Sequence, residues 1–234
     1  HDDQHGTAIV VCAGLINALK VVGKKWEDVN IVINGAGSAG ISICKLILQF
    51  GVGNVVLVDR QGALCPGEEW MNPAQKAMAE ITNKEKQRGP LAEIIKGKDI
   101  FIGVSAPNLV TAEMVTTMAE KPIIFAMANP NPEITPDQAK KGGAYIVGTG
   151  RSDYPNQINN CLAFPGIFRG ALDAKATKIT EEMKVSASYA LAHVLTNEEL
   201  SPENIVPLFN DKRVVKAVAQ AVKETAIKTG FVRK

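Results

Sequence analysis

Short apolar runs recur along this chain, and each is followed by a longer segment whose apolar positions have helical spacing. The runs are continuous rather than alternating, which is typical of parallel strands buried on both faces of a sheet. They lie at 29–34, 54–59, 99–104, 122–127 and 144–148. Strands that alternate with helices predict an α/β fold with a doubly wound, mostly parallel sheet.

Capping residues mark the ends of several predicted helices. Asn72-Pro73 and Thr135-Pro136 each combine an N-cap side chain with a proline in the first turn. Two glycines at 142–143 indicate where the second of these helices ends.

Helices are also expected on either side of the alternating region. A segment over 8–22 is apolar on most of its faces, so we expect it to pack against the sheet or against a neighbouring molecule. Beyond the last predicted strand, a polar loop over 149–163 is followed by helices near 165–174, 180–196 and 211–228.

Composition and charge narrow the class of protein. The chain has 234 residues, of which 46% are hydrophobic and 21% charged, which suits a globular protein with a substantial core. Its net charge of +2 provides no overall field for nucleic acid or for an anionic membrane. We therefore expect neither of them as a partner.

Two further features indicate a soluble, cytoplasmic protein. The 4 cysteines are widely separated and form no C-x-x-C pair, which favours reduced thiols. The longest apolar run, AIVVCAGLINALKVV, contains Asn17 and Lys20, and we expect it to be too short to span a bilayer. It has neither the basic leader nor the cleavage site of a secretory signal.

A glycine-rich turn follows the first strand, in the stretch VNIVINGAGSAGISICKLI. Gly35 permits a tight turn, Gly37 removes the Cβ that would block a pyrophosphate, and Gly40 allows close packing of helix and strand. The N–H groups at the start of the helix would then face the phosphates. The context favours a Rossmann-like dinucleotide site over a turn without a ligand. Its expected cofactor contacts are Gly35, Ala36, Gly37, Ser38, Ala39 and Gly40.

The second strand ends on an acid that fits the ribose subsite. Asp59 lies about 20 residues past the last glycine, where such folds place the carboxylate that binds a ribose 2′-OH. That carboxylate would repel a 2′-phosphate and so favours NAD. The neighbouring Arg60 is able to pair with a 2′-phosphate, or is a solvated loop charge, so NADP stays possible.

Small polar side chains follow the later strands, at the sheet edge where ligands bind in these folds. Ser105 follows the third strand and is expected at the cofactor, whereas Asn108 is interpreted as a turn residue. Asn129 follows the fourth strand, and Asn159 and Asn160 follow the fifth. The Asn amide offers both a donor and an acceptor, which suits a carboxamide or a hydroxy acid.

The chain opens on HDDQHGTA, which places two acids directly before an apolar helix. Asp2 and Asp3 are either ligands of a metal, acids that interact with the helix dipole, or residues exposed by the excision of a domain from a longer chain. From these residues alone the helix-dipole reading is the simpler one.

The motifs HDDQHGTA, GAGSAG, MNP, GVS, ANPNPE and NNCLAFPG occur in this order. Together they resemble the C-terminal, nucleotide-binding domain of bacterial malic enzymes, over essentially the whole chain. The first eight residues and the NN…FPG segment carry most of this specificity, because the glycine motif is shared with many dehydrogenases.

The resemblance implies oxidation of L-malate with NAD or NADP, decarboxylation to pyruvate and CO2, and a requirement for Mg2+ or Mn2+. Hard divalent cations prefer carboxylate oxygens, in agreement with a metal site in the first segment. The implied roles are Asp3 as a metal ligand, Asp2 as a supporting acid, Thr7 near the cofactor, and Asn129, Asn159 and Asn160 at the substrate and nicotinamide.

The same resemblance implies that the general base Lys, the general acid Tyr and two further acidic metal ligands precede the matched region. The chain begins without Met, so we expect an excised domain that is inactive alone. Its expected partners are the missing N-terminal domain and further copies in a homo-oligomer. Its expected parts are a metal-site segment with its helix (1–22), a dinucleotide-binding core (23–150), and a substrate-facing loop with C-terminal helices (151–234).

Two other functions stay open at this point. The cofactor domain of another two-domain dehydrogenase, acting on amino acids or folate, explains the glycine turn but not HDDQHGTA, and it would need no divalent metal. A nucleotide-sensing module without catalysis is favoured if the gene encodes no upstream domain with the catalytic Tyr and Lys.

Overall fold

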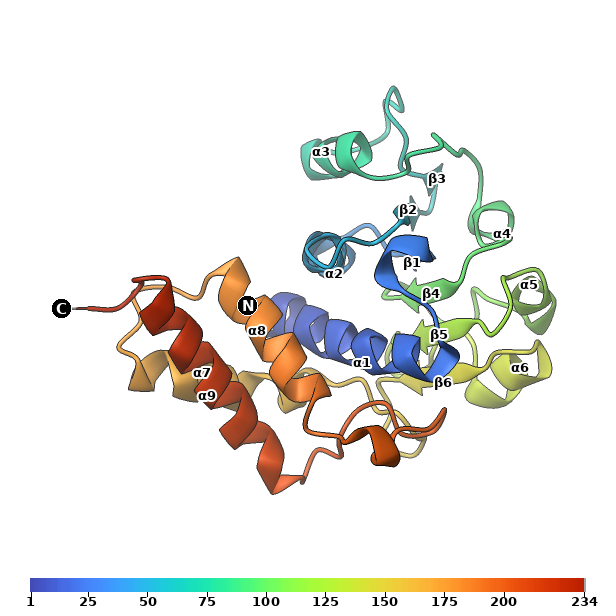
Figure 1. The fold of residues 1–234 in the computed structure, drawn as a ribbon. Coiled ribbons are helices and arrows are strands. Elements are labelled where there is room, and N and C mark those ends of the chain that lie inside the picture. Colours follow the sequence, from blue (N-terminus) through green and yellow to red (C-terminus); the bar gives the residue numbers. More distant parts are fainter. Residues whose placement is uncertain (234) are drawn as a thin grey trace.

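The computed structural model describes residues 1–233 and contains a six-stranded sheet with helices on both faces (Figure 1). The strand order is β3-β2-β1-β4-β5-β6, and all neighbours are parallel except β2 and β3. The predicted doubly wound, mostly parallel sheet is therefore confirmed. The strands are β1 (Asn30–Asn34), β2 (Asn54–Asp59), β3 (Gly62–Ala63), β4 (Ile100–Gly103), β5 (Ile123–Ala126) and β6 (Ile146–Thr149).

Helices connect the strands and extend beyond the sheet at both ends of the described chain. The α-helices are α1 (Thr7–Val22), α2 (Ser38–Leu48), α3 (Pro73–Ile81), α4 (Leu91–Ile94), α5 (Ala112–Thr116), α6 (Pro136–Lys141), α7 (Phe164–Asp173), α8 (Glu181–Ala192) and α9 (Lys212–Lys228). Short 3-10 turns lie at Trp26–Asp28, Asn160–Leu162 and Asn197–Glu199, and a π-helical turn lies at Asp2–Gly6.

Two apolar cores cover the two faces of the sheet. Helices α1 and α2 lie on one face, and α4, α5 and α6 lie on the other (Figure 1). Alternate residues of β1 divide between them, with Ile31 and Ile33 in the first core and Val32 in the second. The parallel strands are thus buried on both faces, as their continuous apolar runs predict.

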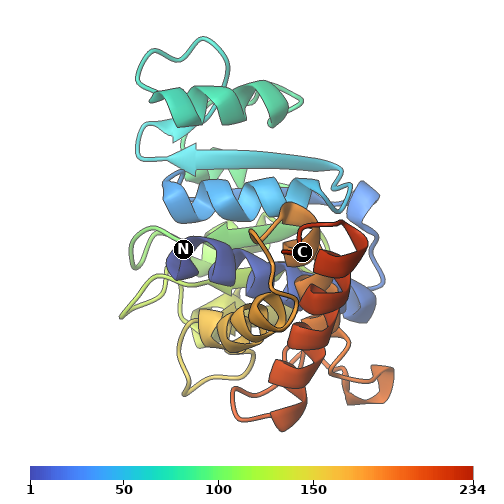
Figure 2. The same ribbon diagram turned by 90° about the vertical axis from the view of Figure 1, so that its left-hand side faces the viewer.

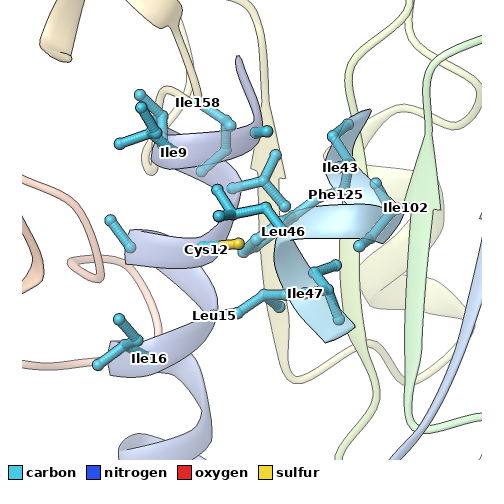
Figure 3. Packing of buried hydrophobic residues seen from close by; sticks show 14 of the residues in the cluster. Ile9, Cys12, Leu15, Ile16, Ile43, Leu46, Ile47, Ile102, Phe125 and Ile158 are labelled. Carbon is cyan, nitrogen blue, oxygen red and sulfur yellow. The ribbon is translucent and has the colours of Figure 1, made fainter. Parts of the chain in front are cut away.

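Helix α1 is the centre of the larger core. Its Cys12 and Leu15 face Leu46 and Ile47 of α2 (Figure 3). Burial raises the pKa of the Cys12 thiol far above its ordinary value, which keeps that thiol protonated. We expected this helix to pack against the sheet or against a neighbouring molecule, and it packs against the sheet domain.

The length argument against a membrane-spanning helix was wrong. The π-helical turn runs directly into α1, so 21 consecutive residues, Asp2–Val22, form a helix with the length and mean hydropathy of a membrane span. However, 78% of that apolar window is buried inside the fold. Burial against α2 and α8 accounts for its apolar composition.

The C-terminal helices pack together on the α1 side of the molecule, where they are coloured orange to red in Figure 2. The buried Asn17 of α1 joins them to the core, because its Nδ2 donates to the carbonyls of Ala192 (2.9 Å) and Ile205 (3.0 Å).

Most predicted boundaries lie within one or two residues of the observed ones. The N-caps Asn72 and Thr135 are confirmed by hydrogen bonds from the N–H groups of Gln75 and Gln138. The last strand begins at Ile146 rather than at residue 144, and α8 ends at Ala192 rather than near residue 196. Elements β3, α4 and α5 were not predicted, because two to five residues are too few to show a period.

Candidate functional site

The carboxyl ends of the parallel strands share one edge of the sheet, and a cavity of about 290 Å3 lies there. The loops after β4, β5 and β6 contribute to it, together with the first turn of α2 and the N-terminal segment. The cavity is lined by Asp3, Thr7, Ala39, Val104, Ser105, Met127, Ala128, Asn129, Gly150, Ile158, Asn159 and Asn160.

Seven of the residues singled out from the sequence line this cavity, although they come from distant parts of the chain. They are Asp3, Thr7, Ala39, Ser105, Asn129, Asn159 and Asn160. Asp2, Asp59 and Arg60 and the remaining residues of the glycine turn do not line it. The sequence did not single out Val104, Met127, Ala128, Gly150 or Ile158, which reach the cavity as neighbours of the polar residues.

The glycine turn joins β1 to α2. Gly35 has a φ of +115°, a conformation that favours glycine. A Cβ on Gly40 would overlap the carbonyl oxygen of Gly35, whereas a Cβ on Gly37 would meet no atom within 4 Å. The turn is therefore tight on its inner side and open at Gly37, next to the free N–H groups of the first turn of α2.

Asp59 ends β2, where its two carboxylate oxygens are held separately. Oδ1 accepts a hydrogen bond from the backbone N–H of Arg60 (2.8 Å), and Oδ2 accepts one from Nε2 of Gln75 (2.6 Å). Gln75 lies in the first turn of α3 and was interpreted from the sequence only as part of a helix. The Arg60 residue is exposed.

Glu133 is a fully buried acid that contacts two residues of the cavity lining, and we predicted no role for it from the sequence. Its two oxygens accept hydrogen bonds from the backbone N–H groups of Ser105 and Ala128, each at 3.0 Å. Burial raises the pKa of its carboxyl, and these backbone hydrogen bonds oppose the rise. Glu133 thus ties together the loops that follow β4 and β5.

The N-terminal turn brings Asp2 to the asparagine pair. Its Oδ2 accepts a hydrogen bond from Nδ2 of Asn160 (2.6 Å), and its Oδ1 is buried without a hydrogen-bond partner among residues 1–233. Burial, and then the charge of Asp3, raise the pKa of the Asp2 carboxyl.

Asp3 presents a second, largely exposed carboxylate to the cavity, 3.8 Å from the ring of His1. Among residues 1–233, no three His, Cys, Asp or Glu side chains lie close enough together to hold a metal ion. Asp3 and the unpartnered oxygen of Asp2 therefore fit part of a hard-cation site, with further oxygen ligands needed from elsewhere.

The similarity of this chain to known proteins shows its family. The family model described as "Malic enzyme, NAD binding domain" matches residues 4–227. The chain belongs to the malic enzyme NAD-binding domain family. The resemblance seen in the sequence is confirmed. Neither the cofactor domain of another two-domain dehydrogenase nor a nucleotide-sensing module is favoured.

Individual malic enzymes are similar over the whole chain. It is 53% identical to the bifunctional malic/malolactic enzyme of Bacillus subtilis and 52% identical to the NAD-dependent malic enzyme of Geobacillus stearothermophilus, covering 100% of this chain in both cases. It covers 57% and 49% of those two proteins, so the chain spans about half the length of these curated relatives.

A solved malic enzyme structure has the same fold. The malic enzyme from Pyrococcus horikoshii matches 100% of this chain and 56% of its own with a TM-score of 0.95 and 43% identity. The malic enzyme fold thus includes the sheet edge, the glycine turn and the C-terminal helices described above.

Proposed function

We propose that this chain is the cofactor-binding part of a malic enzyme that converts L-malate to pyruvate and CO2 and reduces NAD(P). The observation that carries the proposal is the convergence of the glycine turn, the asparagine pair and the two N-terminal acids on one edge of the sheet. Family membership supports the same assignment.

The adenosine half of the cofactor is assigned to the glycine turn and the end of β2. The open space at Gly37 would accept the pyrophosphate, beside the N-terminus of α2. Asp59 would accept the ribose 2′-OH, because each of its oxygens keeps one free lone pair. We propose NAD as the preferred cofactor, since this carboxylate repels a 2′-phosphate.

The nicotinamide and the substrate are assigned to the cavity. Ser105 and Thr7 line it and are assigned to the cofactor, and the amides of Asn129, Asn159 and Asn160 would supply donors and acceptors for the carboxamide and for the hydroxy acid. The hydrogen bond between Asn160 and Asp2 supports the assignment of Asp2 as a supporting acid.

Mg2+ or Mn2+ is the proposed metal, with Asp3 as its ligand from this chain and Asp2 beside it. When bound, such an ion stabilises negative charge on the substrate oxygen during hydride transfer and decarboxylation. This chain's own residues hold the acids in place: the hydrogen bond from Asn160 fixes Asp2, and the N-terminal turn directs Asp3 into the cavity.

The proton-transfer groups and the remaining metal ligands are assigned to an N-terminal malic domain outside this chain. The half-length match to the curated relatives supports this partner. We propose further that the protein is a cytoplasmic homo-oligomer.

Gly37→Val tests the cofactor site in the protein that carries this chain. The branched side chain would occupy the open space proposed for the pyrophosphate, so we expect at least about tenfold weaker NADH binding. Titration followed by NADH fluorescence measures the change. Equal affinities in both proteins would refute the assignment of the turn.

Asp59→Ala tests the choice of cofactor. Removing the carboxylate relieves repulsion of the 2′-phosphate and leaves Arg60 to attract it, so the preference is expected to move toward NADP. Dissociation constants for NADH and NADPH measure the ratio. A wild-type protein that already binds NADPH more tightly would contradict the reading of Asp59.

A further inference from the structure

Gln75 connects three parts of the proposed cofactor site through one side-chain amide. Its Nε2 donates to Oδ2 of Asp59 (2.6 Å) and to the carbonyl oxygen of Ala36 in the glycine turn (3.3 Å). Its Oε1 accepts from the backbone N–H of Asn72 (3.0 Å), which caps α3. The side chain is buried, with 6% of the residue exposed, so these contacts are shielded from water.

The partners leave the amide only one orientation. Asp59 Oδ2 and the Ala36 carbonyl are both acceptors, so both need the NH2 group, whereas the Asn72 N–H needs the amide oxygen. A flipped amide would place its oxygen against two acceptors and its NH2 against a donor. A glutamate in its ionised form would satisfy Asn72 alone.

The contact with Asp59 matters because the direction of that carboxylate decides what the ribose subsite accepts. One lone pair of each oxygen is occupied, one by Arg60 N–H and one by Gln75, and the remaining lone pairs are held in a fixed direction. Without the Gln75 donor, Oδ2 loses the side-chain partner that the described part of the chain gives it, and the carboxylate is free to rotate toward solvent.

We propose that Gln75 is a positioning residue that sets the preference for NAD over NADP, by holding the Asp59 carboxylate toward the ribose 2′-position and tying it to the glycine turn. The inference rests on the proposed dinucleotide site. Its action on the ligand is indirect, through Asp59, and its second donor links the ribose subsite to the pyrophosphate turn at Ala36.

The test uses Gln75→Met, which keeps the length of the side chain and removes the two hydrogen bonds that the amide donates and the one that it accepts from Asn72. Dissociation constants for NADH and NADPH are measured by fluorescence in the protein that carries this chain. We expect the NADH-over-NADPH affinity ratio to fall about tenfold, because a hydrogen bond to an ionised carboxylate is among the strong ones.

Two comparisons separate positioning from a purely structural role. Asn72→Ala breaks the cap of α3 but leaves both Gln75 donors in place, so it is expected to lower the Tm and leave the ratio within about twofold. In the Asp59→Ala background, Gln75→Met is expected to change the ratio no further, because the group through which Gln75 acts is gone.

The outcomes are distinguishable. If the wild-type protein binds neither dinucleotide, the proposed function itself fails. If it binds NADH and Gln75→Met leaves the ratio unchanged, or changes it by the same factor with and without Asp59, the positioning role of Gln75 is overturned.

Discussion

Replacing Asp3 by Ala in the protein that carries this chain is expected to lower malate turnover at least about 100-fold, while NADH affinity stays within about twofold. The carboxylate lines the cavity and is the proposed metal ligand, and loss of such a ligand removes charge stabilisation worth several kcal/mol. Gly37 and Asp59, the proposed pyrophosphate and ribose contacts, do not line this cavity, so the adenosine half of the cofactor keeps its contacts. Turnover is measured as NADH formation from malate with Mn2+.

The matched control is Asp137→Ala, since Asp137 is also an exposed acid in the first turn of a helix, α6. If Asp3 served only the helix dipole, both substitutions would cost a few tenths of a kcal/mol in stability and neither would affect turnover. An active Asp3→Ala enzyme would overturn the metal role.

The 234-residue chain alone is expected to show no turnover, because the general acid–base groups assigned to the other domain contribute about 10²–10⁴-fold each.

Gly103→Ala is expected to lower the free energy of unfolding by about 3 kcal/mol or more. Gly103 ends β4, and a Cβ there would lie 2.6 and 2.7 Å from the two carboxylate oxygens of Glu133. Glu133 is fully buried and cannot move without breaking its hydrogen bonds to Ser105 and Ala128. Urea unfolding measures the change in midpoint.

Gly37→Ala is the control for this prediction. The φ of Gly37 is −86°, and a Cβ there would meet no atom of the described residues within 4 Å. The free energy of unfolding is therefore expected to change by less than about 0.5 kcal/mol. Similar midpoints for Gly103→Ala and the wild type would show that the Glu133 carboxylate has room to shift, contrary to the tight contact described above.

The elements that the sequence predicted correctly depend on interactions between near neighbours. Strand β1, the glycine turn and α2 follow one another directly, and Gly40 lies against the carbonyl of Gly35, five residues before it. The cap of α3 likewise joins Asn72 and Gln75, three residues apart. Local rules of periodicity, capping and sterics suffice at this range.

The contacts that the sequence did not reveal join residues far apart in the chain. Gln75 lies 16 residues from Asp59 and 39 from Ala36, and Glu133 lies 28 residues from Ser105. Gln75 lies in a segment that was correctly predicted to be a helix, and Glu133 lies in a loop that was correctly placed at the sheet edge. Nothing in their immediate neighbours indicates which distant backbone or carboxylate they meet.

Short stretches of sequence suffice to predict the parallel sheet, the glycine turn and the family, because periodic burial, glycine sterics and an ordered set of motifs each depend on residues close together in the chain. The three-dimensional packing was needed to show that Asp2 and Asn160, 158 residues apart, share a hydrogen bond, and that the apolar helix before the first strand is a core helix. The same packing brings the side-chain amide of Gln75 to the Asp59 carboxylate. These are properties of how strands and helices pack in space, and a side chain's partner across the sheet edge depends on that packing rather than on its own segment.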